Sequence, residues 1–350
     1  MKTRILTLIA SLALSTSSFA QTKWDLASAF VPSNFHVENL VQFAGEVDKA
    51  TAGQLKITVH SNSTLFKANE IKRSVQGGQV QAGEILMTAN ENESPLLGVD
   101  GVPFLATNYA SARNLYAAQK PVLQKYLEKQ GLVLLYCVPW PAAGIYTKRP
   151  IESLADMRGV KWRAYSPATT KMGELMAAQP VSVQAAELSQ ALATGVVEAF
   201  MTSSQTGVDS RVYEQVKYFY DLRASLSKNA VIVGVKAFNA LDATQQAAVM
   251  KAAASAEERG WKLSQYWDET SKKTLVQKGM TVTTATPKLY ADTKQLGATM
   301  IQEWKKKAGP EGEIIIADYL KRQTAAPIPF VASVSADAGK RPASDKAGLK

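Results

Sequence analysis

Hydrophobic residues recur along this chain with two alternating periods, one typical of strands and one typical of helices. Alternation at every second position predicts strands over Trp24–Phe30 and Gln54–His60. Between them, Ser33 or Asn34 is the expected N-cap of a helix. The apolar residues of this helix are spaced to form one face: Val37, Leu40, Val41, Ala44 and Val47. A strand, a helix and a strand in residues 24–60 make a βαβ unit, which predicts parallel pairing and a right-handed crossover.

The same rhythm continues through the rest of the chain and predicts an α/β fold. Further strands are expected over Glu84–Ala89, Leu132–Val138, Gly144–Thr147, Val160–Ala164, Val181–Val183, Val196–Met201, Ala230–Val235 and Met280–Thr284. Further helices are expected over Lys67–Gln76, Tyr109–Gln130, Ser166–Met176, Ala186–Thr194, Thr206–Val216, Lys288–Ala308 and Glu311–Arg322. A much longer helix begins after Asp242 and runs to Gln277. Because this helix is much longer than the mean helix of about 11–12 residues, we expect it to span two lobes.

Pro139-Trp140-Pro141 interrupts the pattern and predicts a hinge between those lobes. The first lobe is expected to comprise residues 21–140 with 229–268, because the strand Ala230–Val235 returns the chain to it. The second lobe is expected to comprise residues 141–228 with 269–323. After Gln323 the sequence is rich in Ala, Pro, Ser and Lys, which predicts a disordered tail over residues 324–350.

The first twenty residues have the pattern of a secretory signal peptide. Lys2 and Arg4 form the basic start, Ile5–Leu14 is the apolar core, and a small-x-small cleavage site ends at Ala20. The apolar core is shorter than the about 20 residues of a membrane-spanning helix. We therefore expect the mature chain to be exported into a bacterial periplasm.

Composition and charge exclude several kinds of site. The formal net charge is +10, but basic and acidic residues are interspersed, so the chain lacks the basic stripe of a nucleic-acid-binding protein. A positive field favours anionic small molecules instead. Cys137 is the single cysteine, so no intrachain disulfide is expected. His36 and His60 stand in different predicted elements and fit no metal-binding motif, so neither a metal nor a cofactor is expected.

Arg163 is the candidate binding residue that the pattern singles out. Gly159 is expected to end a short helical turn over Ser153–Arg158, before the strand Val160–Ala164. Arg163 then lies at the carboxyl end of this strand, the edge at which open α/β sheets bind ligands. A guanidinium matches a carboxylate through two parallel hydrogen bonds. From spacing alone, however, a solvent-exposed charge is the simpler interpretation.

The run PIESLADMRGVKWRAYSPA resembles the segment that carries the ligand-anchoring arginine in substrate-binding proteins of TRAP (tripartite ATP-independent periplasmic) transporters of the DctP type. The resemblance covers nearly the whole mature chain. It implies a two-lobe periplasmic-binding-protein fold with a hinge, a central ligand cleft and a long helix that bridges both lobes. It also implies a small-molecule carboxylate ligand anchored by Arg163, no catalytic residues, and the small and large membrane subunits of the transporter as partners. Relatives that bind dicarboxylates often carry a second arginine where this chain has Ala143, so a monocarboxylate is expected.

Other residues are candidates for contact with the ligand. Trp140 and Tyr146 would form an aromatic wall, with packing in the hinge and core as the alternative role. Thr202 and Ser203 lie in an expected loop where the family often places a hydrogen-bonding group, and Phe200 would pack on an apolar ligand body. The remaining candidates lie near the expected cleft: Phe35, Glu91 and Asn92. Together these residues predict a monocarboxylate with an apolar or aromatic body, such as an aryl hydroxy or keto acid.

Two other classes of protein remain open at this point. The binding component of another importer, or a chemoreceptor, would share the two lobes but not the Arg163 segment or the long helix. A periplasmic enzyme acting on small organic acids would need a catalytic pair, and the sequence contains no catalytic or nucleotide-binding motif. The Ala- and Pro-rich tail favours a monomer.

Overall fold

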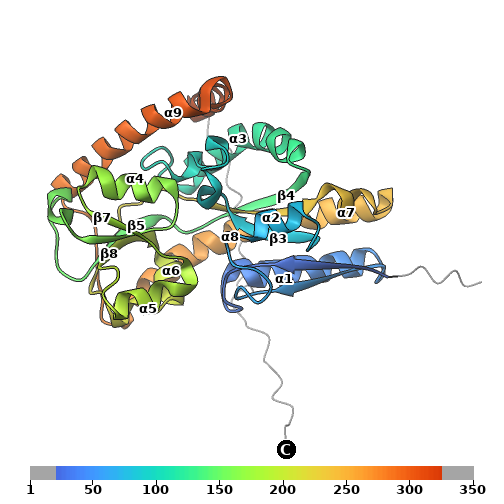
Figure 1. The fold of residues 1–350 in the computed structure, drawn as a ribbon, viewed down its shortest axis with the longest axis horizontal. Helices are drawn as coiled ribbons and strands as arrows, with labels where there is room; N and C mark the ends of the chain where they lie inside the picture. The colour runs from blue at the N-terminus through green and yellow to red at the C-terminus, as the bar shows by residue number, and fades with distance from the viewer. Residues whose placement is uncertain (1–20, 325–350) are drawn as a thin grey trace, which may run out of the picture.

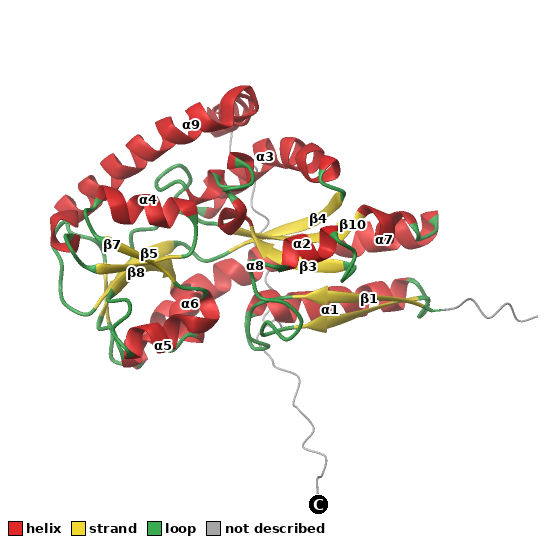
Figure 2. Cartoon of the chain, viewed as in Figure 1, coloured by secondary structure: helices red, strands yellow, loops and turns green. Residues whose placement is uncertain are grey.

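The computed structural model describes residues 21–324, which form two β-sheets with helices packed around them (Figures 1 and 2). The predicted signal peptide and residues 325–350 of the predicted tail lie outside the described residues. Within residues 21–324, no helix combines the length and the apolar composition needed to cross a membrane. The α/β class predicted from the sequence is confirmed.

The first sheet has the strand order β2-β1-β3-β10-β4, and we call the part of the molecule built on it the first lobe. Its strands are β1 (Thr22–Ala27), β2 (Leu55–His60), β3 (Ala82–Leu86), β4 (Leu132–Pro139) and β10 (Lys228–Gly234). β1 pairs in parallel with β2 and β3, which confirms the parallel pairing predicted for the first βαβ unit. β10 runs antiparallel between β3 and β4, so a segment from late in the chain completes this sheet.

The second sheet has the order β11-β9-β5-β8-β6-β7 and forms the second lobe. Its strands are β5 (Ala143–Thr147), β6 (Lys161–Ala164), β7 (Gln179–Ser182), β8 (Ala199–Ser203), β9 (Tyr218–Tyr220) and β11 (Thr281–Thr283). The sequence did not predict β9, because three consecutive aromatic residues are too short to show a period. β6 pairs in parallel with β7 and β8, so the carboxyl ends of these three strands meet at one edge.

The helices are α1 (Phe35–Ala50), α2 (Ile71–Gln76), α3 (Tyr109–Lys129), α4 (Pro167–Leu175), α5 (Leu188–Ala193), α6 (Ser204–Asp209), α7 (Val235–Asn239), α8 (Ala243–Gln277) and α9 (Pro287–Thr324). Asn34 and Asp242 cap α1 and α8 through their side chains, as predicted. α9 covers the two helices predicted at the end of the chain, and Gly309 breaks it between them with a φ of 57°. α9 extends to Thr324, one residue into the predicted tail.

Two predictions at the edge of the second sheet are wrong. No loop follows the strand at Thr202, because Thr202 and Ser203 belong to β8 and Ser204 begins α6 directly. The helix predicted to reach Val216 ends at Asp209. Arg211 adopts a left-handed conformation with a φ of 49°, which interrupts the helical path.

α8 links the two lobes, as the long periodic pattern and the resemblance implied. It packs against α1 and β4 in the first lobe and against α6 and β11 in the second. Trp261 Nε1 donates to the carbonyl oxygen of Cys137 in β4. Ser271 Oγ donates to Gln205 Oε1 in α6. A single continuous helix therefore contacts both lobes, and Figure 2 shows it passing behind the region between the sheets.

The second sheet is closely packed around Gly144 in β5. A Cβ at this position would lie 2.3 Å from the carbonyl oxygen of Tyr220 and 2.5 Å from the Phe219 ring. Gly144→Ala is therefore expected to lower the free energy of unfolding by about 1–3 kcal/mol through overpacking. Gly45→Ala is the control, because no atom lies within 4 Å of its added Cβ. In the interior of α1 it should raise stability by about 0.5–1 kcal/mol. Urea denaturation measures the free energy of unfolding of both variants. Equal stabilities of the two variants would contradict the close packing around Gly144.

Candidate ligand-binding site

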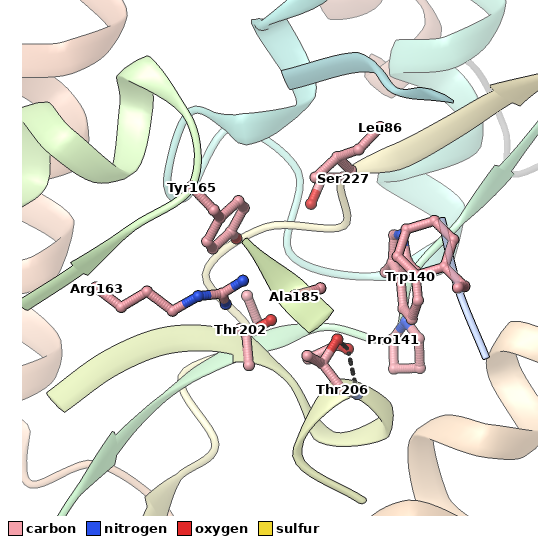
Figure 3. Close-up of a pocket in the computed structure, with 12 residues that line it drawn as sticks. Leu86, Trp140, Pro141, Arg163, Tyr165, Ala185, Thr202, Thr206 and Ser227 are labelled. Atoms are coloured by element: carbon pink, nitrogen blue, oxygen red, sulfur yellow. Dashed lines mark hydrogen bonds between the residues drawn. The ribbon is translucent and has the colours of Figure 1, made fainter. Parts of the chain in front are cut away.

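A cavity lies between the two lobes, at the edge where strands of both sheets end (Figure 3). It contains about 420 Å³ of space between atoms, part of it open to solvent. The residues that line it are Phe30, Leu86, Trp140, Pro141, Ala143, Arg163, Tyr165, Ala185, Thr202, Ser203, Thr206 and Ser227. β3, β6 and β8 reach the cavity with their carboxyl ends, where α/β sheets are expected to bind ligands.

Arg163 reaches the cavity because the preceding residues fix where β6 begins. Ser153 and Asp156 form the capping box of a short 3₁₀ turn over Leu154–Met157. Gly159 follows with a φ of 71°, as predicted, and turns the chain into β6. Successive side chains of a strand point to opposite faces. Trp162 therefore packs into the core, while the side chain of Arg163 extends toward the cavity (Figure 3).

The guanidinium of Arg163 is buried without an acidic partner. The residue is 2% exposed, and its Nε donates to the carbonyl oxygen of Val183 at 2.9 Å. Burial lowers the pKa of Arg163 to about 10, so it remains protonated at neutral pH. Among residues 21–324, no carboxylate forms an ion pair with it, and Glu187 attracts it only from a greater distance. Because a buried cation is costly without a paired anion, the cavity favours an anionic ligand.

Tyr165 and Thr202 flank Arg163 in the cavity wall (Figure 3). The guanidinium carbon of Arg163 lies 4.7 Å from the centre of the Tyr165 ring, so the ring covers one face of the cation. Burial raises the pKa of the Tyr165 hydroxyl, so it stays a neutral phenol. Thr202 is buried beside it. This side of the cavity therefore combines a cation with two neutral hydroxyl groups.

The Ser203 hydroxyl is engaged within the protein. Its Oγ accepts a hydrogen bond from the backbone amide of Thr206 at 3.1 Å and lies 3.0 Å from Thr206 Oγ1. Ser203 therefore serves first as the N-cap of α6. Both residues still line the cavity, but their hydroxyl groups satisfy each other.

Trp140 and Phe30 form an aromatic wall of the cavity, and their ring centres lie 4.9 Å apart. The indole Nε1 of Trp140 donates to Asn229 Oδ1 at 2.8 Å. Ala143 also lines the cavity, at the position where the resemblance places a second arginine in dicarboxylate-binding relatives. Its methyl group brings no charge, so Arg163 is the one charged side chain among the lining residues of this cavity.

Three other sequence candidates lie behind the cavity wall rather than in it. Tyr146 and Phe200 are fully buried, and their rings stack with centres 4.7 Å apart. The Tyr146 hydroxyl donates to the carbonyl oxygen of Ser203 at 3.1 Å. Phe35 is also fully buried, with its ring centre 5.8 Å from that of Trp140. Each of the three packs against a lining residue or its strand, but none lines the cavity itself.

Glu91 and Asn92 lie outside this cavity. Glu91 packs against Gly98, and burial raises the pKa of its carboxyl group. Asn92 lines a second, more open cavity of about 1020 Å³, to which α4 and α9 contribute charged residues. Tyr165 borders both cavities, so it separates Asn92 from the region around Arg163. Among residues 21–324, no three metal-ligating side chains cluster in a way that could hold a metal ion.

Sequence reasoning missed several lining residues, and some of them carried a usable signal. Tyr165 follows β6 directly, and Phe30 follows β1, so the rule that places ligands at carboxyl ends would have found both. Ser227 precedes an antiparallel strand, and no pattern in the sequence points to it. Thr206 comes to the cavity only because α6 begins directly after β8.

Two lobes, a helix that bridges them and a cavity with one buried cation between them are the parts that a solute-binding receptor needs. The family model described as "Bacterial extracellular solute-binding protein, family 7" (DctP) matches residues 27–307. The chain therefore belongs to the DctP family, whose members are extracytoplasmic solute receptors and not enzymes. This finding agrees with the resemblance seen in the sequence.

Solved structures of similar receptors share the fold. DctP6 of Bordetella pertussis, an extracytoplasmic solute receptor that binds pyroglutamic acid, is 53% identical with a TM-score of 0.85, over 86% of this chain and 100% of that one. DctP7 of the same organism also binds pyroglutamic acid and is 44% identical with a TM-score of 0.85, over 85% and 99% of the two chains. A marine metagenome TRAP solute-binding protein with copurified pyroglutamate is 40% identical with a TM-score of 0.85, over 86% and 99%.

A curated relative also matches part of the chain. A solute-binding protein of Albidiferax ferrireducens is 30% identical over 179 residues, which are 50% of this chain. The match spans about half, 52%, of the length of that relative.

Proposed function

We propose that this protein is the extracytoplasmic receptor that delivers pyroglutamate, a cyclic monocarboxylate, to a TRAP transporter. The observation that carries the proposal is the buried Arg163 guanidinium, which has no ion-pair partner in residues 21–324 and lines a cavity without any other charged side chain. Such a site can pair one anionic group of a ligand with a cation, but it offers no cation for a second anionic group. Ala143 occupies the position at which a second cation would be expected.

The similar receptors support the choice of pyroglutamate. Three solved receptors that are 53%, 44% and 40% identical to this chain bind this compound. The sequence had predicted a monocarboxylate with an apolar or aromatic body. The relatives favour the monocarboxylate and replace the aromatic body with a saturated lactam ring.

The proposed binding mode assigns each part of the ligand to one wall of the cavity. The carboxylate accepts two hydrogen bonds from the Nη groups of Arg163, since its Nε is already bound to Val183. The lactam ring packs on the aromatic wall of Trp140 and Phe30. The lactam amide, which both donates and accepts, faces the hydroxyl groups of Tyr165 and Thr202.

Closure of the lobes must supply much of the affinity. Hydrogen bonds to a charged group contribute about 1.5–3 kcal/mol each, whereas micromolar binding needs about 8 kcal/mol. Burying the ring between the lobes supplies the difference, and the closed form is then the one that the small and large membrane subunits bind. The signal peptide expected over residues 1–20 would direct export of the receptor, and the members of this family are extracytoplasmic.

A thermal-shift and calorimetry screen tests the proposal. Pyroglutamate is expected to raise the melting temperature, with stabilisation of about 2.7 kcal/mol at a concentration 100 times the dissociation constant. The neutral lactam 2-pyrrolidinone should give none, because it lacks the carboxylate. Mandelate represents the aryl hydroxy acids and galacturonate the sugar acids. Stabilisation by either of these acids, with none by pyroglutamate, would overturn the ligand assignment.

A further inference from the structure

We propose that Glu84 is a positioning residue for ligand binding, which acts through Asn229 to hold the indole of Trp140 against the ligand. The inference rests on the proposed function, because Trp140 forms part of the wall assigned to the lactam ring. Glu84 itself does not line the cavity. It lies one layer behind the wall, in β3, and is 2% exposed.

A chain of hydrogen bonds connects Glu84 to the cavity. Asn229 Nδ2 donates to Glu84 Oε1 at 3.0 Å, and Trp140 Nε1 donates to Asn229 Oδ1 at 2.8 Å. The three residues come from β3, from β10 and from the residue that follows β4, in the order in which these strands lie in the sheet. The chain therefore crosses three adjacent strands and ends at the hinge position where the first lobe meets the second.

The other oxygen of Glu84 is also engaged, which fixes the carboxyl group in place. Ser28 Oγ donates to Glu84 Oε2 at 2.6 Å, and His36 Nδ1 lies 3.3 Å from Glu84 Oε1. The His36 ring in turn packs on Trp140, with the ring centres 4.4 Å apart. Trp140 is thus held twice by the same carboxyl group, once through Asn229 at the indole N–H and once through His36, whose tilted ring packs against the indole.

This arrangement determines what Trp140 offers to a ligand. The indole N–H is the only strong hydrogen-bond donor of a tryptophan side chain, and Asn229 occupies it. Trp140 therefore presents an apolar ring surface to the cavity and no free donor. Loss of Glu84 would release the Asn229 amide, which could then rotate and leave the indole N–H without its acceptor. The wall would lose its orientation while Arg163 stays unchanged.

Glu84→Gln tests the inference, because it keeps the shape but replaces one acceptor oxygen with a donor. The expected result is binding of pyroglutamate about fivefold to tenfold weaker by calorimetry, the effect of about one hydrogen bond. The matched control is Glu257→Gln, a carboxyl group on α8 that accepts from Tyr116 and Lys120, away from the cavity. It should lower the melting temperature but leave the affinity within about twofold of the unmodified protein.

A double-mutant cycle separates positioning from general destabilisation. In a Trp140→Phe background, Glu84→Gln should cause no further loss of affinity, because its route to the ligand is already gone. Additive losses would overturn the inference, as would an unchanged affinity in folded Glu84→Gln. Should Glu84→Gln fail to fold, Asn229→Ser removes the next member of the same chain, the acceptor of the Trp140 indole N–H, and must give the same pattern.

Near-ultraviolet circular dichroism of the ligand-free protein gives an independent measurement. Glu84→Gln should change the tryptophan bands, and the change should vanish in the Trp140→Phe background. An unchanged spectrum would contradict the inference even if pyroglutamate binds. If the unmodified protein does not bind pyroglutamate, only the assignment of the ligand is wrong. The spectral comparison still decides whether Glu84 positions Trp140.

Discussion

Arg163→Ala is expected to weaken pyroglutamate binding by about 100-fold or more, because it removes the partner of a desolvated carboxylate. The ligand carboxylate would then be buried without a cation, because Arg163 is the one charged side chain among the lining residues of the cavity. Arg163→Lys should recover only part of the loss, since a lysine keeps the charge but cannot form two parallel hydrogen bonds. Isothermal titration calorimetry measures both variants.

The matched control is Arg158→Ala, which removes an exposed arginine of the same lobe. It lowers the net charge by the same amount, so it accounts for any general electrostatic attraction of the anion. Its dissociation constant should stay within about twofold of the unmodified value. Comparable losses in the two variants would show that long-range attraction, and not a contact with Arg163, binds the carboxylate.

Lys228→Met is expected to cost about 3–5 kcal/mol of folding stability, because it leaves a buried carboxylate without its counterion. Lys228 and Asp100 are almost fully buried, and Lys228 Nζ lies 2.9 Å from Asp100 Oδ2. The same oxygen accepts a hydrogen bond from the Lys228 backbone amide at 2.8 Å. Lys288→Met removes an exposed partner of Asp292 and should cost at most about 1 kcal/mol. Chemical denaturation compares the two.

The loss of folding stability in Lys228→Met is expected to depend on pH, and the pKa of Asp100 determines the sign of this dependence. Burial raises the pKa of Asp100, and the positive charge of Lys228 opposes that rise. Without Lys228, the folded-state pKa of Asp100 rises further above its unfolded-state value. The folded variant then binds more protons than the unfolded chain between those two pKa values, so its stability increases as the pH falls. The stability gap between Lys228→Met and the unmodified protein should therefore be smaller at about pH 5 than at about pH 7. A gap that widens on acidification would contradict the assignment.

Long periodic segments of this fold were predictable because local signals agreed with the final packing. α1 and α8 begin at the expected caps, Asn34 and Asp242. Short elements were less predictable, since their neighbours decide them. α6 has only six residues and ends at Asp209, just before the left-handed Arg211, while β9 is three aromatic residues paired with β5 and β11. Neither length is enough for a period to appear in the sequence.

The position of Arg163 was predictable from the end of its strand, but its burial was not. Burial depends on Val183 and on the Tyr165 ring, which come together only in the folded chain. Thr202 lines the cavity as expected, whereas Phe200 does not. At the end of β8 the side chains reach the cavity, but farther back the Tyr146 ring covers Phe200. The alternation of residues along a strand predicts the face of the sheet on which a side chain lies, but not how deeply that side chain is buried.

The place of β10 in the first sheet affects how the chain acquires its structure during synthesis. β3 and β4 leave the ribosome well before Lys228–Gly234, the strand that must separate them. Until then each has an unpaired inner edge, and pairing them directly would create a misregistered intermediate that later has to dissociate. An N-terminal fragment that stops before Lys228 would therefore be an aggregation-prone translation product rather than an autonomous half of the receptor.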